Sequence, residues 1–150
     1  MESGKITDSQ ISASSRYNDF GSARMGRLHN QDGSGAWTAA TNDSNPWLQV
    51  NFGSYVTRVT RVATQGRYGE FIQWVIDYKL QHSQDGVNFQ YYREQGQTTD
   101  KVFTGNTDQD TVVSHDLNPP ITARYIRFQP VESKTWISMR VELYGCQQGT

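Results

Sequence analysis

The chain has 150 residues, 35% of them hydrophobic, and a formal net charge of −1. This length suits one domain that buries a core of its own. A net charge so close to zero argues against binding nucleic acid by neutralising its phosphates, so we expect no nucleic-acid partner. No apolar run is long enough to cross a bilayer, and Met1 to Lys5 lack the apolar stretch of a secretory signal. The chain is therefore either cytosolic or a piece of a longer protein.

Residues 13–45 carry no strand pattern, and only scattered apolar residues interrupt their polar sequence. An irregular segment of this length is usually a functional loop region or disorder. Four large side chains within it argue for folded loops, namely Tyr17, Phe20, Met25 and Trp37. We therefore expect binding loops here.

The rest of the chain is typical of β-structure. Val, Ile and Thr total 32 residues, against 12 for Ala and Leu. Short apolar or alternating runs predict strands over residues 47–52, 56–62, 75–82, 88–93, 111–116, 123–128 and 138–144. Clusters of Gly, Asn, Asp, Ser and Pro predict turns over residues 51–54, 83–86, 104–108 and 118–120. This spacing favours an all-β sandwich or barrel.

No motif in the sequence indicates catalysis, a metal site or a cofactor. His29, His82 and His115 are far apart, and a single cysteine cannot build a local zinc cluster. The oxygen-rich runs 32–35 and 106–110 lack the spacing of an EF-hand, and we interpret them as turns. There is no nucleophile elbow and no phosphate-binding glycine loop. We expect a binding protein that is not an enzyme.

Aromatic and charged residues gather in the predicted loops, where such groups suit sugar or peptide recognition. They are Arg16, Tyr17, Phe20, Arg24, Met25, Arg27, Asp32 and Trp37, then residues 67–71 and 134–136. Trp47 and Trp74 begin strand-like runs and are expected in the core. Trp37 and Trp136 fit either the core or the binding loops.

The sequence resembles the discoidin domain family, also called the coagulation factor 5/8 type C domain. The resemblance is strongest over residues 122–130, TARYIRFQP, and 137–146, ISMRVELYGC. Further blocks match in order: ISASS at 11–15, AWT at 36–38, WLQV at 47–50, TQGR at 64–67, SQDG at 83–86 and GNTD at 105–108. The resemblance implies one domain over residues 1–146 with a short tail over 147–150. It also implies an eight-stranded jelly-roll β-sandwich, like galactose-binding domains, with ligand loops at one end.

The resemblance further implies a disulfide between Cys146 and a cysteine just upstream of Met1, in a larger secreted or cell-surface protein. Within this chain Cys146 would be a free thiol. We therefore expect an extracellular or cell-surface location. Asn42-Asp43-Ser44 is an N-glycosylation sequon in a predicted loop, and sugar would attach at Asn42 in a secreted protein.

The first hypothesis for the ligand is a cell-surface glycan or a matrix or receptor protein such as collagen. Collagen-binding and galactose-binding members of the family are similar at Asp32 and Arg67, which we expect to meet beside Trp37. Members that bind a peptide's terminal arginine are similar at Tyr17 and Thr38. The expected ligand-binding residues are Tyr17, Asp32, Trp37, Thr38, Arg67 and Tyr68.

The alternative hypothesis is peripheral binding to membranes that contain phosphatidylserine. Family members with this activity project large apolar side chains from their loops. The residues expected to contact a membrane are Phe20, Met25, Phe71 and Trp136, with Tyr68 nearby. Each such side chain would contribute roughly 1.5–3 kcal/mol if fully buried.

Overall fold

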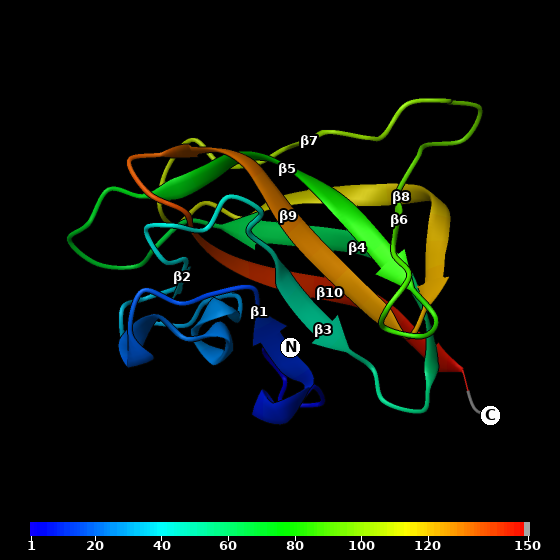
Figure 1. Ribbon diagram of the computed structural model, residues 1–150, viewed down its shortest axis with the longest axis horizontal. Coiled ribbons are helices and arrows are strands. Elements are labelled where there is room, and N and C mark those ends of the chain that lie inside the picture. The colour runs from blue at the N-terminus through cyan, green and yellow to red at the C-terminus, as the bar shows by residue number, and fades with distance from the viewer. Residues whose placement is uncertain (149–150) are drawn as a thin grey trace.

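The structure, a computed structural model, describes residues 1–148 and consists of two antiparallel sheets packed face to face (Figure 1). The larger sheet has the strand order β1-β3-β9-β5-β6, and β7 pairs with β5. Its strands are β1 (Ile11–Ala13), β3 (Leu48–Asn51), β5 (Trp74–Ser83), β6 (Gln90–Tyr91), β7 (Phe103–Thr104) and β9 (Tyr125–Lys134). The prediction of an all-β sandwich is confirmed.

The smaller sheet has the strand order β2-β10-β4-β8. Its strands are β2 (Trp37–Thr38), β4 (Val56–Gln65), β8 (Val113–Ala123) and β10 (Ser138–Gln148). The three helices found among the described residues are short 3₁₀ turns: η1 (Asp8–Gln10), η2 (Asp19–Gly21) and η3 (Ala23–Gly26). None of the helices in residues 1–148 has the length and apolar character needed to cross a membrane.

The alternation of side chains along the strands creates the core between the two sheets. In β3, Leu48 and Val50 are fully buried, whereas Gln49 and Asn51, which alternate with them, are half-buried. In β9, Ile126 and Phe128 point inward with the same period of two. The core also contains stacked Tyr78 and Phe103 rings, whose centroids lie 5.3 Å apart. This apolar interior is the rigid body from which the loops extend.

All seven predicted strands form, but the structure corrects the expected number of strands. Ten strands occur in the described part of the chain instead of eight, and four of them, β1, β2, β6 and β7, are only two or three residues long. Gln147 and Gln148, which open the expected tail, lie in β10 and pair with Thr57 and Val56. The last two residues of that predicted tail, 149–150, lie outside the described residues.

The predicted turn over residues 118–120 is wrong, because this segment lies inside β8. β8 is the outer strand of the smaller sheet, so Pro119 and Pro120 need no amide hydrogen on its free side. The β4–β8 pairing skips them, and the register shifts between Val59 and Arg61. Other groups use their carbonyls: the Tyr92 hydroxyl donates to Pro119 O at 2.8 Å.

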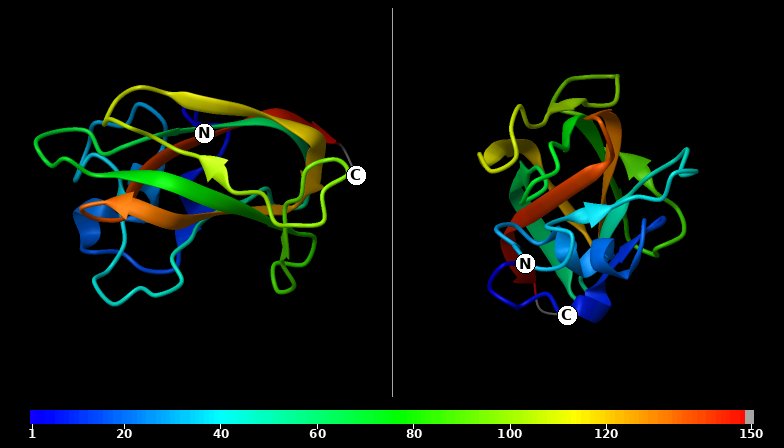
Figure 2. Two further views of the ribbon diagram at one scale, coloured as in Figure 1. Left: turned by 90° about the horizontal axis from the view of Figure 1, so that it is seen from above. Right: turned by 90° about the vertical axis from the view of Figure 1, so that its left-hand side faces the viewer.

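The irregular segment 13–45 folds against one end of the sandwich. It contains η2, η3 and β2, and it lies at the left-hand end of Figure 1 with the loop between β4 and β5 and the loop between β9 and β10. Figure 2 shows this end facing the viewer in its right-hand panel. We call it the loop end.

Candidate ligand-binding site

Backbone hydrogen bonds join loops that are far apart in the sequence at the loop end. The Tyr17 amide donates to Thr38 O at 2.8 Å, and the Ser34 amide donates to Phe20 O at 2.7 Å. The Tyr68 amide donates to Gly35 O at 3.0 Å. Arg67 therefore lies at the same end as residues 32–38, as the sequence predicts.

Gly35 permits the close approach of two of these loops. Its φ of +85° lies in the left-handed region, and a Cβ built on it would lie 2.1 Å from Tyr68 O. Any larger residue would therefore push apart the segments that carry Ser34 and Arg67.

A cleft of about 510 Å³ opens between the joined loops. Its lining residues are Tyr17, Asn18, Ser34, Thr38, Thr41, Arg67, Phe71, Gln73 and Trp136. Tyr17 and Trp136 form one wall, with ring centroids 5.9 Å apart and planes at 86°. The Trp136 indole is fixed because its Nε1 donates to Ala39 O at 2.9 Å. The wall offers ordered aromatic surface to a ligand.

The cleft has a polar floor that is held by buried hydrogen bonds. The Gln73 Oε1 accepts from Ser138 Oγ at 2.7 Å and from Arg67 Nη1 at 3.0 Å. Ser138 Oγ in turn lies 3.2 Å from Thr38 Oγ1. Within residues 1–148 the Gln73 amide NH₂ has no hydrogen-bond acceptor, so it is free to donate to a ligand.

Arg67 places a positive charge in the cleft. Its Nε donates to Ser34 O at 2.6 Å, and its guanidinium carbon lies 4.3 Å from the centroid of the Phe71 ring. Burial lowers the pKa of Arg67, and nearby Glu70 partly opposes that shift. Among the described residues no carboxylate forms an ion pair with it. The charge is therefore available to an anionic group.

Asp32 and Arg67 lie on loops that meet, as expected, but no ion pair joins them in residues 1–148. Asp32 is exposed in a turn closed by the Gly35 amide, which donates to Asp32 O at 2.9 Å. No ion pair in the described part of the chain involves its carboxylate. Arg67 instead donates to the backbone of Ser34, because that carbonyl lies within reach of its Nε. Asp32 does not line the cleft.

Trp37 was expected to contact a ligand and Met25 a membrane, but both side chains are buried. Trp37 is 0% exposed, and its Nε1 donates to Ser15 O at 2.8 Å. Met25 is 6% exposed and packs beneath Gly33. Neither side chain reaches a ligand or a membrane in this structure, and both support the loops from below.

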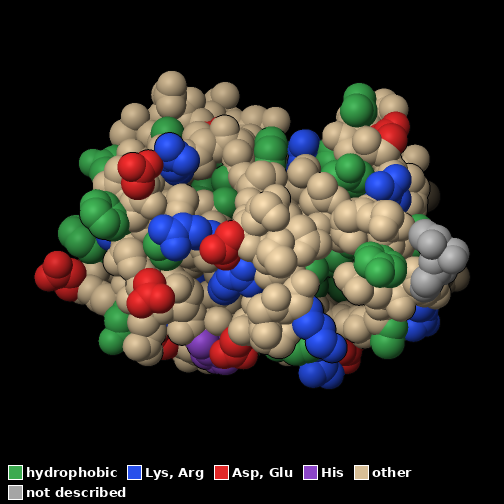
Figure 3. Space-filling view, turned by 90° about the horizontal axis from the view of Figure 1, so that it is seen from below, with side chains coloured by type: hydrophobic (Ala, Val, Ile, Leu, Met, Phe, Trp, Pro, Cys, Tyr) green, Lys and Arg blue, Asp and Glu red, His purple; other side chains and the backbone are tan. Residues whose placement is uncertain are grey.

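Five exposed apolar side chains lie on the loops that form the cleft, two of them in its lining, and we call the five the apolar rim. They are Tyr17 (59% exposed), Phe20 (67%), Tyr68 (39%), Phe71 (52%) and Ile72 (57%). Figure 3 shows hydrophobic side chains at the left-hand end of the molecule, and others toward its right-hand end. The sequence analysis did not identify Ile72 as a site residue. Its position between Phe71 and the strand that begins at Trp74 was a signal that it lies on a loop. Exposed apolar side chains grouped on loops often mark a surface that contacts a partner.

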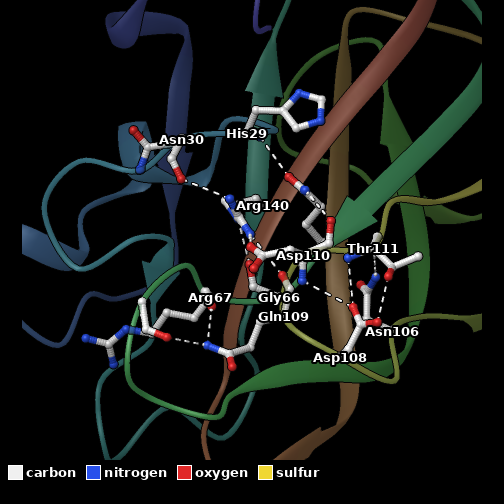
Figure 4. Close-up of polar contacts among 12 residues, drawn as sticks. His29, Asn30, Gly66, Arg67, Asn106, Asp108, Gln109, Asp110, Thr111 and Arg140 are labelled. Carbon is white, nitrogen blue, oxygen red and sulfur yellow. Dashed lines mark hydrogen bonds and ion pairs between the residues drawn. The ribbon is translucent and has the colours of Figure 1, made fainter.

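Arg140 stabilises the base of the loop end. The sequence analysis did not identify this role either. Arg140 is 1% exposed in β10 (Figure 4). Its Nε donates to Gly66 O at 2.7 Å, and its Nη1 donates to Asn30 O at 3.0 Å. Its Nη2 donates to Asp110 Oδ1 at 2.8 Å and to Gln109 O at 2.9 Å. One buried side chain thus joins three loops.

Gln109 extends this network to the loop that carries Arg67 and Phe71. Its Nε2 lies 2.9 Å from Arg67 O, 2.7 Å from Gly69 O and 2.9 Å from Phe71 O. An amide NH₂ has only two hydrogens, so the three carbonyls share them. Figure 4 shows Gln109 beside Arg67, with Asp108 and Thr111 in the same turn. The loop backbone is fixed by a side chain that does not line the cleft.

The structure is thus an antiparallel two-sheet sandwich with a cleft between the loops at one end, the arrangement of a module that presents a ligand site on its loops. The family model described as F5/8 type C domain matches residues 10–143. The chain belongs to this family, as its sequence motifs indicate.

Relatives and solved structures agree with this membership. The chain is 41% identical to lactadherin of Rattus norvegicus over 97% of its own length and 35% of the relative's. It is 40% identical to EGF-like repeat and discoidin I-like domain-containing protein 3 of Homo sapiens, over 99% and 32%. The chain thus spans about a third of the length of these curated relatives.

The solved structure of discoidin II from Dictyostelium discoideum matches with a TM-score of 0.80 and 30% identity, over 90% of this chain and 54% of that one. A family 32 CBM from C. perfringens NanJ, in complex with galactose, has a TM-score of 0.61 and 18% identity over 91% of each chain. This second match shows the shared fold alone.

Proposed function

We propose that the chain is a peripheral membrane-binding domain that uses its loop end to dock on anionic phospholipid. The main support for this proposal is that the apolar rim lies beside a cleft that contains Arg67. In residues 1–148, Arg67 forms no ion pair with a carboxylate. The rim would enter the acyl boundary, and the cleft would take a negatively charged headgroup.

The expected energies suit reversible docking. Each rim side chain that becomes fully buried contributes roughly 1.5–3 kcal/mol. A cation near an anionic lipid surface adds about 1 kcal/mol, and Arg24 and Lys134 are exposed cations on loop-end segments. Two or three inserted side chains with one or two cations would hold the domain on a vesicle and still allow release.

Sedimentation with phosphatidylcholine vesicles, with and without phosphatidylserine, tests this proposal. We expect pelleting that depends on phosphatidylserine. Phe20→Ala and Phe71→Ala should each weaken it about tenfold or more, since each removes at least about 1.5 kcal/mol of burial. Arg67→Gln should reduce the dependence on phosphatidylserine.

Val87→Ala is the matched control, because Val87 is 79% exposed in the turn that follows β5, at the far end of that strand from Phe71. It should bind like the unmodified chain. Absence of pelleting at low salt, or equal losses for Val87→Ala and Phe71→Ala, would overturn the proposal.

A glycan or matrix protein is the second candidate ligand. The aromatic wall of Tyr17 and Trp136 and the free amide of Gln73 favour it, because sugars bind to ring faces and polar donors. An array of glycans and collagens would test it. Binding there that Tyr17→Ala and Trp136→Ala abolish, without vesicle binding, would favour this candidate over the membrane.

The same proposal includes an extracellular location. One relative's name includes EGF-like repeats, which are disulfide-dense modules of secreted proteins. Cys146 is exposed and unpaired within residues 1–148, so it is accessible to a cysteine outside this chain. That pairing, and the domain boundary at residue 146, stay predictions.

A further inference from the structure

The sequon Asn42-Asp43-Ser44 lies in a turn that none of the preceding roles uses. It is the one Asn-x-Ser/Thr triplet in the 150-residue sequence. A glycan on such a triplet is bulky and polar, so the folded chain must accommodate it at the surface. The geometry of the turn therefore decides whether Asn42 can carry a glycan.

The middle residue of the sequon holds the turn in place. Ser14 Oγ and Ser15 Oγ both donate to Asp43 Oδ2, each at 2.5 Å. The Asn45 amide donates to Asp43 Oδ1 at 3.2 Å, and the Asp43 amide donates to Ala40 O at 3.2 Å. With Asp43 turned toward the body, its two neighbours in the triplet are free to face away from it.

Asn42 and Ser44 are both exposed. Neither side chain makes a hydrogen bond within residues 1–148, whereas Asp43 between them makes several. The cyan segment that contains them projects from the body in both panels of Figure 2. A glycan on Asn42 would thus displace no internal contact.

The turn also adjoins the cleft. Thr41, the residue before Asn42, lines the cleft together with Thr38. A glycan on Asn42 would therefore stand beside the ligand site.

We propose that Asn42 is an N-glycosylation site and that its glycan partly shields the cleft. The donor is an oligosaccharide carried on a lipid pyrophosphate. Its anomeric carbon forms a bond to Asn42 Nδ2, the carbon–oxygen bond to the pyrophosphate breaks, and the amide nitrogen loses one proton. The lipid pyrophosphate leaves with the bonding electron pair, so no oxidant or reductant is needed. This inference rests on the extracellular location proposed above.

Secretion of the chain from mammalian cells, followed by intact mass measurement before and after peptide-N-glycosidase treatment, tests the site. We expect a glycan mass that the enzyme removes, and that Asn42→Gln and Ser44→Ala both abolish. Asn45→Gln is the matched control, since Asn45 is an exposed neighbour outside the triplet, and it should keep the glycan. An unmodified secreted chain, or a glycan that persists in Asn42→Gln, would overturn the site.

Vesicle binding by the glycosylated and the deglycosylated chain tests the shielding. We expect several-fold weaker binding by the glycosylated form, and equal binding would overturn the shielding. Binding by neither form would overturn the proposed function and the shielding together. The site itself is decided by mass alone, so the two failures are distinguishable.

Discussion

The guanidinium of Arg140 donates hydrogen bonds to three backbone carbonyls. Replacing it by Met would leave Gly66 O, Asn30 O and Gln109 O without this partner. Each buried carbonyl that loses its partner costs about 1–3 kcal/mol. We expect Arg140→Met to lower the free energy of unfolding by about 3 kcal/mol or more, measured by urea denaturation.

The control for this variant is Arg93→Met. Arg93 forms an exposed ion pair with Asp100 at 3.2 Å, and surface pairs contribute about 0–1 kcal/mol. Similar losses for the two variants would contradict the role assigned to Arg140.

Asp85 links stability to pH through the turn after β5. Backbone hydrogen bonds from Asn88 and Val87 lower its pKa below the ordinary value of 3.8, with smaller contributions from the side chains of Asn88 and Ser83. A carboxyl whose pKa is lower in the folded state stabilises the fold above its unfolded pKa and loses that effect as pH falls toward the folded value. We expect stability to decline below about pH 4.

Thermal unfolding between pH 6 and pH 2 of the unmodified chain and of Asp85→Asn measures this contribution. The variant should show a shallower decline over the acid range, because it has no carboxyl to protonate at this turn. Parallel curves for the two proteins would assign the acid sensitivity to other groups, such as Asp108, whose pKa is also lowered by bonds from Thr111.

The loop between β4 and β5 owes its shape to a neighbouring turn. Gln109 contacts three of its carbonyls, and Asn106 anchors that turn by donating to Thr64 O at 3.0 Å and Thr111 O at 2.9 Å. Gln109→Ala should therefore loosen the loop while the core remains packed. We expect faster hydrogen exchange at the Tyr68 amide and several-fold weaker ligand binding, with little change in Tm.

Gln84→Ala is the matched control for Gln109→Ala. Gln84 also donates from its amide to a backbone carbonyl, Thr122 O at 2.8 Å, but it lies after β5 and outside the loop end. Its variant should bind as the unmodified chain does. If Gln109→Ala also binds normally and Tyr68 exchanges at its usual rate, Gln109 has no positioning role.

The sequence predicted the strands well because burial on one or both faces leaves a direct pattern of apolar residues. The prediction failed at residues 118–120, where two adjacent prolines indicate a turn. Prolines are compatible with a strand when that strand lies at the edge of its sheet. Edge position depends on the order of strands in the sheet, which is not local information. The same limit explains why β2 and β7, two residues each, were missed.

The sequence predicted where the ligand site lies, but it did not predict the side-chain contacts within the loop end. The family motifs brought Tyr17, Thr38 and Arg67 together, and all three line the cleft. Nothing local in the sequence distinguishes buried Trp37 from exposed Phe20, because both are aromatic residues in an irregular segment. Arg140 looked like one more residue of a strand, and only the fold reveals the three loops around it.

The whole molecule divides its tasks between the loop end, which presents the ligand site, and the sandwich, which supports it. Its loop end presents the apolar rim and the cleft, while the long strands β4, β5, β9 and β10 keep that end rigid. A preformed surface binds without the cost of ordering its loops. Affinity should then depend more on the rim side chains than on any change of shape.

The two prolines in the outermost strand of the smaller sheet bear on how crowded copies of this molecule behave. An incoming strand from another copy needs amide hydrogens with which to pair, and Pro119 and Pro120 offer none. The opposite border of that sheet is β2, only two residues long. Neither border is a good template for sheet extension, so the smaller sheet should resist fibril-like stacking even where many copies gather on one surface.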